Sequence, residues 1–179
     1  MVQVSRALFS LSVLAVTLSI PLKRTVAQDE SDIEAIGSDV DTLDTAISGF
    51  PASGLVGALE IDLDANNLAS AITAATSELT STGVVDEADG TNILNDVAAF
   101  IPTIEDALTK LVADKTAAGE LPIPGVPTLI ESELQKLQTD TEAFGDALEA
   151  VMPAALQASA TAVVNEVLGA LATAVAAYN

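Results

Sequence analysis

The feature that most constrains the fold of this 179-residue chain is a series of aliphatic side chains spaced three and four residues apart. The clearest example has steps of 3, 4, 3, 4 and 3 and consists of Ile33, Ile36, Val40, Leu43, Ile47 and Phe50. This spacing places all six side chains on one face of an α-helix, because one turn takes 3.6 residues. No stretch of useful length alternates apolar and polar residues, so strands are not predicted.

Five helical segments follow from this spacing and from the residues that begin or end helices. The first three are expected over about residues 29–50, 55–82 and 86–118. The third contains Pro102, and we interpret it as one long helix kinked there, with two shorter helices as the alternative. Residues 119–127, with three prolines and two glycines, form the clearest loop. A fourth helix follows this loop, and Pro153 is expected in the first turn of a fifth.

The composition favours helices packed on helices. Half of the residues are apolar but only 3% are aromatic, so a core must be built from Ala, Leu, Ile and Val. There is no Cys, and stability must therefore come from packing without disulfides. The sequence predicts an all-α fold, an antiparallel bundle of about five amphipathic helices.

Residues 1–24 are expected to be a secretory signal peptide, with or without a short pro-segment. Arg6 supplies the positive charge, and the apolar stretch over residues 7–20 is too short for a comfortable membrane span. Lys23-Arg24 is either a dibasic processing site or a chance pair. We therefore expect residues 25–179 to form one secreted, extracellular domain that binds lipids or hydrophobic surfaces, in the medium or in a cell wall.

Removing this leader leaves three Lys and 26 acidic residues, a net charge of −23, and no Arg. A chain of this charge has almost nothing to neutralise phosphates, which excludes nucleic acid and a polybasic membrane anchor. The apolar run that begins at Ala160 is interrupted by Asn165 and Glu166, so it indicates an amphipathic helix. No transmembrane anchor is predicted.

The residue types that carry most catalytic and metal chemistry are missing. Without His and Cys the chain lacks the usual general base, the commonest metal ligand and the ligands of structural zinc. A calcium loop starting at Asp62 fails, because Asn67 and Thr73 occupy the positions that need Gly and Glu. The remaining acidic residues are spread over the polar faces, as is typical of a solvated surface. We predict no enzyme, no metal site and no cofactor.

The apolar faces carry the informative chemistry. Leu, Ile and Val form the stripes, and Ala often stands between them. Such small residues either let helices pack closely, which composition alone favours, or leave an apolar cavity of the kind that suits a fatty acyl chain. A bundle that opens would instead expose its stripes to a hydrophobic surface. The candidate lipid-contacting residues are Ile36, Val40, Leu43, Ile47, Leu68, Ile72, Leu79, Ile93, Val97, Ile101, Leu108, Leu134, Leu137, Phe144, Leu148, Val164, Val167, Leu171 and Val175.

Several short motifs, in their order and with their prolines, make the chain resemble the hydrophobic surface-binding protein A family of fungal secreted proteins. They are Thr25-Val26-Ala27-Gln28 leading into Asp32-Ile33, Leu43-Asp44-Thr45-Ala46-Ile47 before Phe50-Pro51, Glu87-Ala88-Asp89-Gly90 with Ile93-Leu94, Pro102-Thr103-Ile104 with Asp106-Ala107-Leu108, Gly125-Val126-Pro127, and the closing segment Ala170 to Tyr178. The resemblance covers nearly the whole of the expected mature chain.

The resemblance implies a small adsorbing protein that coats hydrophobic solids and recruits a secreted esterase. It also extends to cell-wall galactomannoproteins, which bind fatty acids inside a five-helix bundle. This relation supports the cavity as strongly as composition supports close packing, and both alternatives stay open. It implies no catalytic residues. A structural or antigenic cell-wall protein with protein or glycan partners is the alternative.

Overall fold

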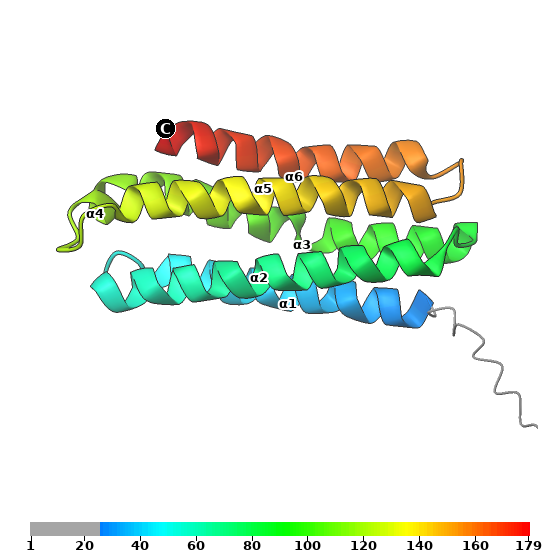
Figure 1. The fold of residues 1–179 in the computed structure, drawn as a ribbon, viewed down its shortest axis with the longest axis horizontal. Coiled ribbons are helices and arrows are strands. Elements are labelled where there is room, and N and C mark those ends of the chain that lie inside the picture. The colour runs from blue at the N-terminus through cyan, green and yellow to red at the C-terminus, as the bar shows by residue number, and fades with distance from the viewer. Residues whose placement is uncertain (1–25) are drawn as a thin grey trace, which may run out of the picture.

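The computed structural model describes residues 26–179 and consists of six helices (Figure 1). The helices are α1 (Val26–Gly49), α2 (Gly54–Thr82), α3 (Glu87–Ala113), α4 (Lys115–Gly119), α5 (Val126–Val151) and α6 (Gln157–Tyr178). Five are long, α4 has five residues, and no strand occurs within the described range. The predicted all-α bundle of five main helices is confirmed. The expected signal peptide and Lys23-Arg24 lie outside the described residues.

The local sequence explains where these helices begin and end. Asp86 caps α3, because its side chain accepts hydrogen bonds from the backbone amides of Ala88 and Asp89, both at 2.9 Å. Gly83, expected as a stop, follows α2 with a φ of 82°, and Gly125 precedes α5 with a φ of 90°. Both values lie in the region where a side chain is strained, so glycine suits these two turns.

Three sequence-based boundaries were wrong. The third helix continues through Pro102 as one helix, which was the first of the two alternatives. It was expected to reach about residue 118, but it ends at Ala113 and a separate α4 follows Asp114. The loop is shorter than predicted, since α5 begins at Val126 and Pro127 lies in its first turn, where the missing amide hydrogen is not needed. Pro153 lies in the turn before α6, which begins four residues later.

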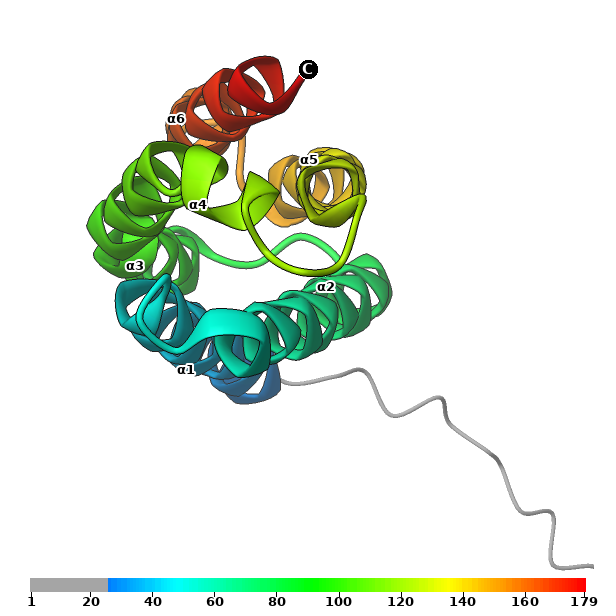
Figure 2. The same cartoon turned by 90° about the vertical axis from the view of Figure 1, so that its left-hand side faces the viewer.

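The five long helices form a closed ring. Each packs against two others, in the spatial order α1, α2, α5, α6, α3 and back to α1. Figure 2 shows this ring along its axis, with α4 and the segment after it at the end that faces the viewer. A ring of five cylinders leaves more central space than a bundle of four, so side chains must reach far inward to fill it.

The two ends of the ring differ, and we name them by their connections. At the closed end α1 begins, residues 83–86 join α2 to α3, and residues 152–156 join α5 to α6. At the open end residues 50–53 join α1 to α2, and α4 with residues 120–125 joins α3 to α5.

The closed end is densely packed. It contains the largest fully buried side chains of the described chain, which are Asp29, Ile33, Leu79, Ile93, Leu148 and Met152. The amide of Val85 donates a 2.9 Å hydrogen bond to the carbonyl of Val151 and ties two connections together. Gly90 has no room for a side chain, since a Cβ atom there would lie 2.9 Å from Leu156 and 3.1 Å from the Met152 sulfur.

Candidate functional site

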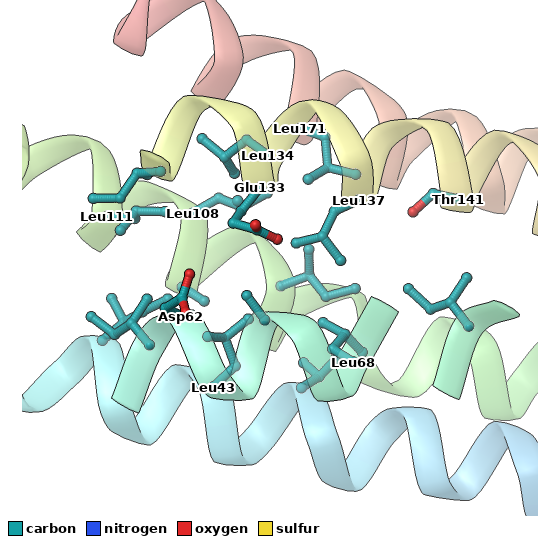
Figure 3. A pocket seen from close by; sticks show the side chains of 18 of the residues that line it. Leu43, Asp62, Leu68, Leu108, Leu111, Glu133, Leu134, Leu137, Thr141 and Leu171 are labelled. Carbon is teal, nitrogen blue, oxygen red and sulfur yellow. The ribbon is translucent and has the colours of Figure 1, made fainter. Parts of the chain in front are cut away.

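A cavity of about 190 Å³ lies on the axis of the ring, bounded by all five long helices. Its walls are aliphatic apart from three Phe side chains and three polar residues, as Figure 3 shows in part. Along α5 it runs from Val126 to Phe144, a length of about 27 Å at 1.5 Å per residue. The site is therefore long, narrow and almost entirely apolar.

The cavity is large for a packed core and small for a whole lipid. A dry apolar cavity of about 150 Å³ holds a benzene-sized molecule, and typical ligand pockets measure about 300–1,000 Å³. The ring must therefore widen, or part of the bound molecule must lie outside it, when a long acyl chain binds. Aliphatic side chains without directional bonds allow such adjustment more readily than a polar network does.

The cavity reaches the surface at the open end. Leu59, Ile123 and Leu129 line it and are nevertheless 59%, 45% and 46% exposed. Val56 and Leu63 on the first turns of α2 are also exposed, at spacings that continue the same side of that helix. We call these five residues the apolar rim. An exposed group of aliphatic side chains around an apolar opening is typical of a hydrophobic binding surface.

Three polar side chains face the cavity: Asp62 on α2, and Glu133 and Thr141 on α5. Asp62 and Glu133 point from the neighbouring helices α2 and α5 into the space between them in Figure 3. The Oε2 atom of Glu133 is buried and has no hydrogen-bond partner within residues 26–179. A buried acceptor without a donor destabilises a fold by about 1–3 kcal/mol, so this carboxylate has a cost in the empty protein.

The three lysines of the described residues are engaged elsewhere. Lys110 contacts Asp44 at 2.9 Å and also Asp106, and Lys115 donates to the carbonyl of Ala177. Lys136 donates a 2.9 Å hydrogen bond to the side-chain oxygen of Asn66, across the exposed side of the α2–α5 contact. None of the three lines the cavity.

Tyr178 holds the C-terminal end of α6 against α3 at the open end. Its hydroxyl donates a 2.7 Å hydrogen bond to the carbonyl of Leu111, and its ring lies 5.5 Å from the Lys115 ammonium. Burial raises the pKa of Tyr178 to about 12, and the negative charge of Asp114 acts in the same direction. The neutral phenol is therefore favoured in the folded protein.

Most of the candidate residues from the sequence meet at this cavity. Fourteen of the 19 line it: Ile36, Val40, Leu43, Ile47, Leu68, Ile72, Val97, Leu108, Leu134, Leu137, Phe144, Val164, Val167 and Leu171. The other five do not line it; four are buried and Val175 is partly buried, and they are Leu79, Ile93, Ile101, Leu148 and Val175. Leu79, Ile93 and Leu148 do not line the cavity because they lie at the densely packed closed end.

The candidate set omitted 17 residues that line the cavity. They are Phe50, Leu55, Ala58, Leu59, Ile61, Asp62, Ala65, Phe100, Ile104, Ala107, Leu111, Ile123, Val126, Leu129, Ile130, Glu133 and Thr141. Spacing offered a signal for Glu133, which comes three residues after Ile130 and four before Leu137, within the apolar stripe. Nothing in the local sequence marks Ile123, which belongs to a connection.

The described residues show no arrangement that would hold a metal. Across residues 26–179 no three Asp or Glu side chains gather into a group that could bind a metal ion. Of the helices in this range, α6 is long and apolar enough to span a bilayer. This is weak evidence for a membrane helix, because a core helix has the same properties, and α6 packs on α3 and α5.

Three solved structures are similar to this ring. The chain is similar to AFMP4P, solved in complex with palmitic acid, with 27% identity, a TM-score of 0.81 and coverage of 87% of this chain and 100% of that chain. It is also similar to ligand binding domain 1 of Penicillium marneffei MP1 protein, complexed with arachidonic acids, at 17% identity, TM-score 0.78 and coverage of 87% and 97%. Domain 2 of that protein, complexed with multiple arachidonic acids, has 14% identity, TM-score 0.78 and coverage of 88% and 97%. The two MP1 domains are similar in fold alone.

A search of curated protein sequences gives no match. The sequence profile of one family does match, over residues 26–150, which include α1 to α4 and nearly all of α5. Those segments contribute every part of the cavity wall except that from α6. The chain belongs to the hydrophobic surface binding protein A family.

Proposed function

We propose that this protein is a non-catalytic lipid-binding protein that takes a long aliphatic chain into the cavity of its helical ring. The observation that carries the proposal is the cavity itself, with aliphatic walls contributed by all five long helices and a rim open to solvent. Burial of apolar surface supplies the binding free energy, at about 25 cal/mol per Å² removed from water.

The solved relatives support this proposal. AFMP4P has the same fold over its whole length and was solved with palmitic acid, a saturated chain without kinks. The proposed contacts in this chain are the 14 candidate residues that line the cavity, together with the rim residues Leu59, Ile123 and Leu129. The proposal has three further parts that rest on sequence and family. They are secretion, with residues 1–24 as a leader, location in a cell wall, and recruitment of an esterase.

Native mass spectrometry of protein made in a eukaryotic secretory host tests lipid binding. The delipidated protein is incubated with a long-chain fatty acid or fatty alcohol, and a complex at whole-number stoichiometry is expected. Two variants form a matched pair. Leu134→Trp narrows the cavity and should reduce lipid binding. Leu63 is exposed and does not line the cavity, so Leu63→Trp should bind lipid as the wild type does. A clean unliganded mass for the wild-type protein would contradict the proposal.

A second function, adsorption to hydrophobic solids, is favoured by family membership and by the apolar rim. The charge of the expected mature chain opposes crowding at an interface at pH 7, and carboxylates with reference pKa values near 4 lose that charge in acid. We expect denser adsorption to an aliphatic polymer at about pH 4 than at pH 7 in low salt. A quartz microbalance that registers no adsorption at either pH would contradict it. Replacing Val56 and Leu63 by Ser should reduce adsorption without changing lipid uptake.

A further inference from the structure

The cavity has an unusual polar feature where Asp62 and Glu133 face each other. Both side chains line an otherwise aliphatic wall, and the buried Oε2 of Glu133 has no donor within residues 26–179. An ionised carboxylate only accepts hydrogen bonds, so the group that completes this site must donate one. The cavity extends from Glu133 in both directions along α5, to Val126 and to Phe144, which leaves room for an attached chain.

The charges around this point disfavour an anionic head group. No lysine lines the cavity, and Lys136, one turn after Glu133 on α5, is exposed and bound to Asn66. An ionised fatty acid would place a third negative charge beside Asp62 and Glu133 in an apolar setting, where like charges repel strongly. A neutral hydroxyl instead donates its hydrogen to Glu133 and adds no charge.

We propose that the cavity selects long-chain lipids whose polar end is a neutral hydroxyl group, with Glu133 accepting the hydrogen bond from that hydroxyl. This inference rests on the proposed function, because it concerns the head group of a lipid held in the same cavity. Asp62 faces the hydroxyl from α2 and weakens the binding of anionic heads, and the aliphatic walls hold the tail.

Competition between two lipids of equal chain length tests the inference. The delipidated full protein is loaded at pH 7 with N-phenyl-1-naphthylamine, an uncharged fluorescent apolar probe, and titrated with 1-hexadecanol or with hexadecanoate. Hexadecanol should displace the probe at concentrations about tenfold lower or more, the scale of a hydrogen bond to a charged group.

Variants at Glu133 separate this role from a general effect of charge. Glu133→Gln should shrink the preference for the alcohol to less than about threefold, since the amide also donates to a carboxylate. Glu142→Gln is the matched control, because Glu142 is exposed on the same helix and does not line the cavity, and it should keep the wild-type preference. Lys136→Met should also keep it. Circular dichroism confirms that each variant is folded.

The outcomes distinguish this inference from the proposed function. If the probe and both lipids fail to bind, the proposed function and the inference both fall. If both lipids bind with equal affinity, or if Glu133→Gln leaves the preference unchanged, only the head-group inference is overturned. A selective loss of hexadecanoate binding in Lys136→Met would show that the lysine holds an anionic head and would likewise overturn it.

Discussion

At the closed end of the ring, Ile33, Leu79 and Ile93 are at most 1% exposed, whereas at the open end Leu43, Leu108 and Leu134 surround empty space. Both ends use the same aliphatic residue types at the same helical spacing. The difference lies in what closes the ends. Connections of a few residues bring Met152 and Val85 into the core at the closed end, and the connection with α4 leaves the open end with an exposed apolar rim.

The two ends of the ring therefore have different roles. The closed end holds the five helices together. The open end can adapt to a guest because the cavity wall is almost entirely apolar and can repack. Binding sites are commonly less stable than the scaffold that supports them. Variants at the two ends should therefore differ in stability and in lipid binding.

The largest expected effect comes from truncating two leucines of α5, one at the closed end and one that lines the cavity. Leu148→Ala should lower the free energy of unfolding by about 4 kcal/mol, because a cavity opens in packed surroundings. Leu137→Ala should cost about 2 kcal/mol, because that side chain already borders empty space and loses fewer contacts. Urea denaturation of the lipid-free protein measures both. Equal losses would mean that the two ends are packed alike.

Enlarging alanines on α2 should have opposite consequences at the two ends. Ala75→Leu overfills the packed region and should destabilise by about 1–3 kcal/mol. Ala65→Leu extends into the cavity and should leave stability unchanged or raise it, while weakening lipid binding. Thermal unfolding and probe titration provide the two readouts. Destabilisation of similar size by both changes would refute the difference in packing.

Removing the Glu133 carboxylate, whose Oε2 atom has no donor within residues 26–179, should stabilise the lipid-free protein. Glu133→Leu replaces a buried acceptor by apolar atoms that suit the cavity wall, and the free energy of unfolding should rise by about 1 kcal/mol. The exposed Glu142→Leu is the control and should change it by less than about 0.5 kcal/mol. A loss of stability in Glu133→Leu would show that the carboxylate is already satisfied.

Replacing Tyr178 should have the smallest effect on the free energy of unfolding. Its hydrogen bond shows that part of the open end is held firmly. Because its pKa of about 12 in the folded protein exceeds its usual value near 10, the folded state retains the proton longer. Its contribution to stability is complete below pH 10 and declines as the pH rises from 10 to 12. Tyr178→Phe should cost about 1 kcal/mol at pH 7 through the lost bond to Leu111 and should flatten that decline. Denaturant titrations between pH 7 and 12 provide the check.

The sequence predicted the helices well because each is recorded in local spacing, as in the stripe from Ile33 to Phe50. It did not predict the ring, since the contact of α2 with α5 depends on packing between segments 70 residues apart. The cavity depends on that ring, so Leu137 and Leu148 had the same appearance in the sequence although one borders empty space. Glu133 was interpreted as part of a solvated surface, although its spacing from Ile130 and Leu137 places it within the apolar stripe.

A crystal structure of the protein mixed with a sixteen-carbon lipid, palmitic acid or 1-hexadecanol, shows whether the ring takes an aliphatic chain into its cavity. We predict continuous density for an aliphatic chain on the ring axis, in contact with Leu43, Leu108 and Leu134, with the closed end unchanged. Crystals grown in excess lipid that show those three side chains collapsed onto one another, with the lipid absent or only on the outer surface, would contradict the account.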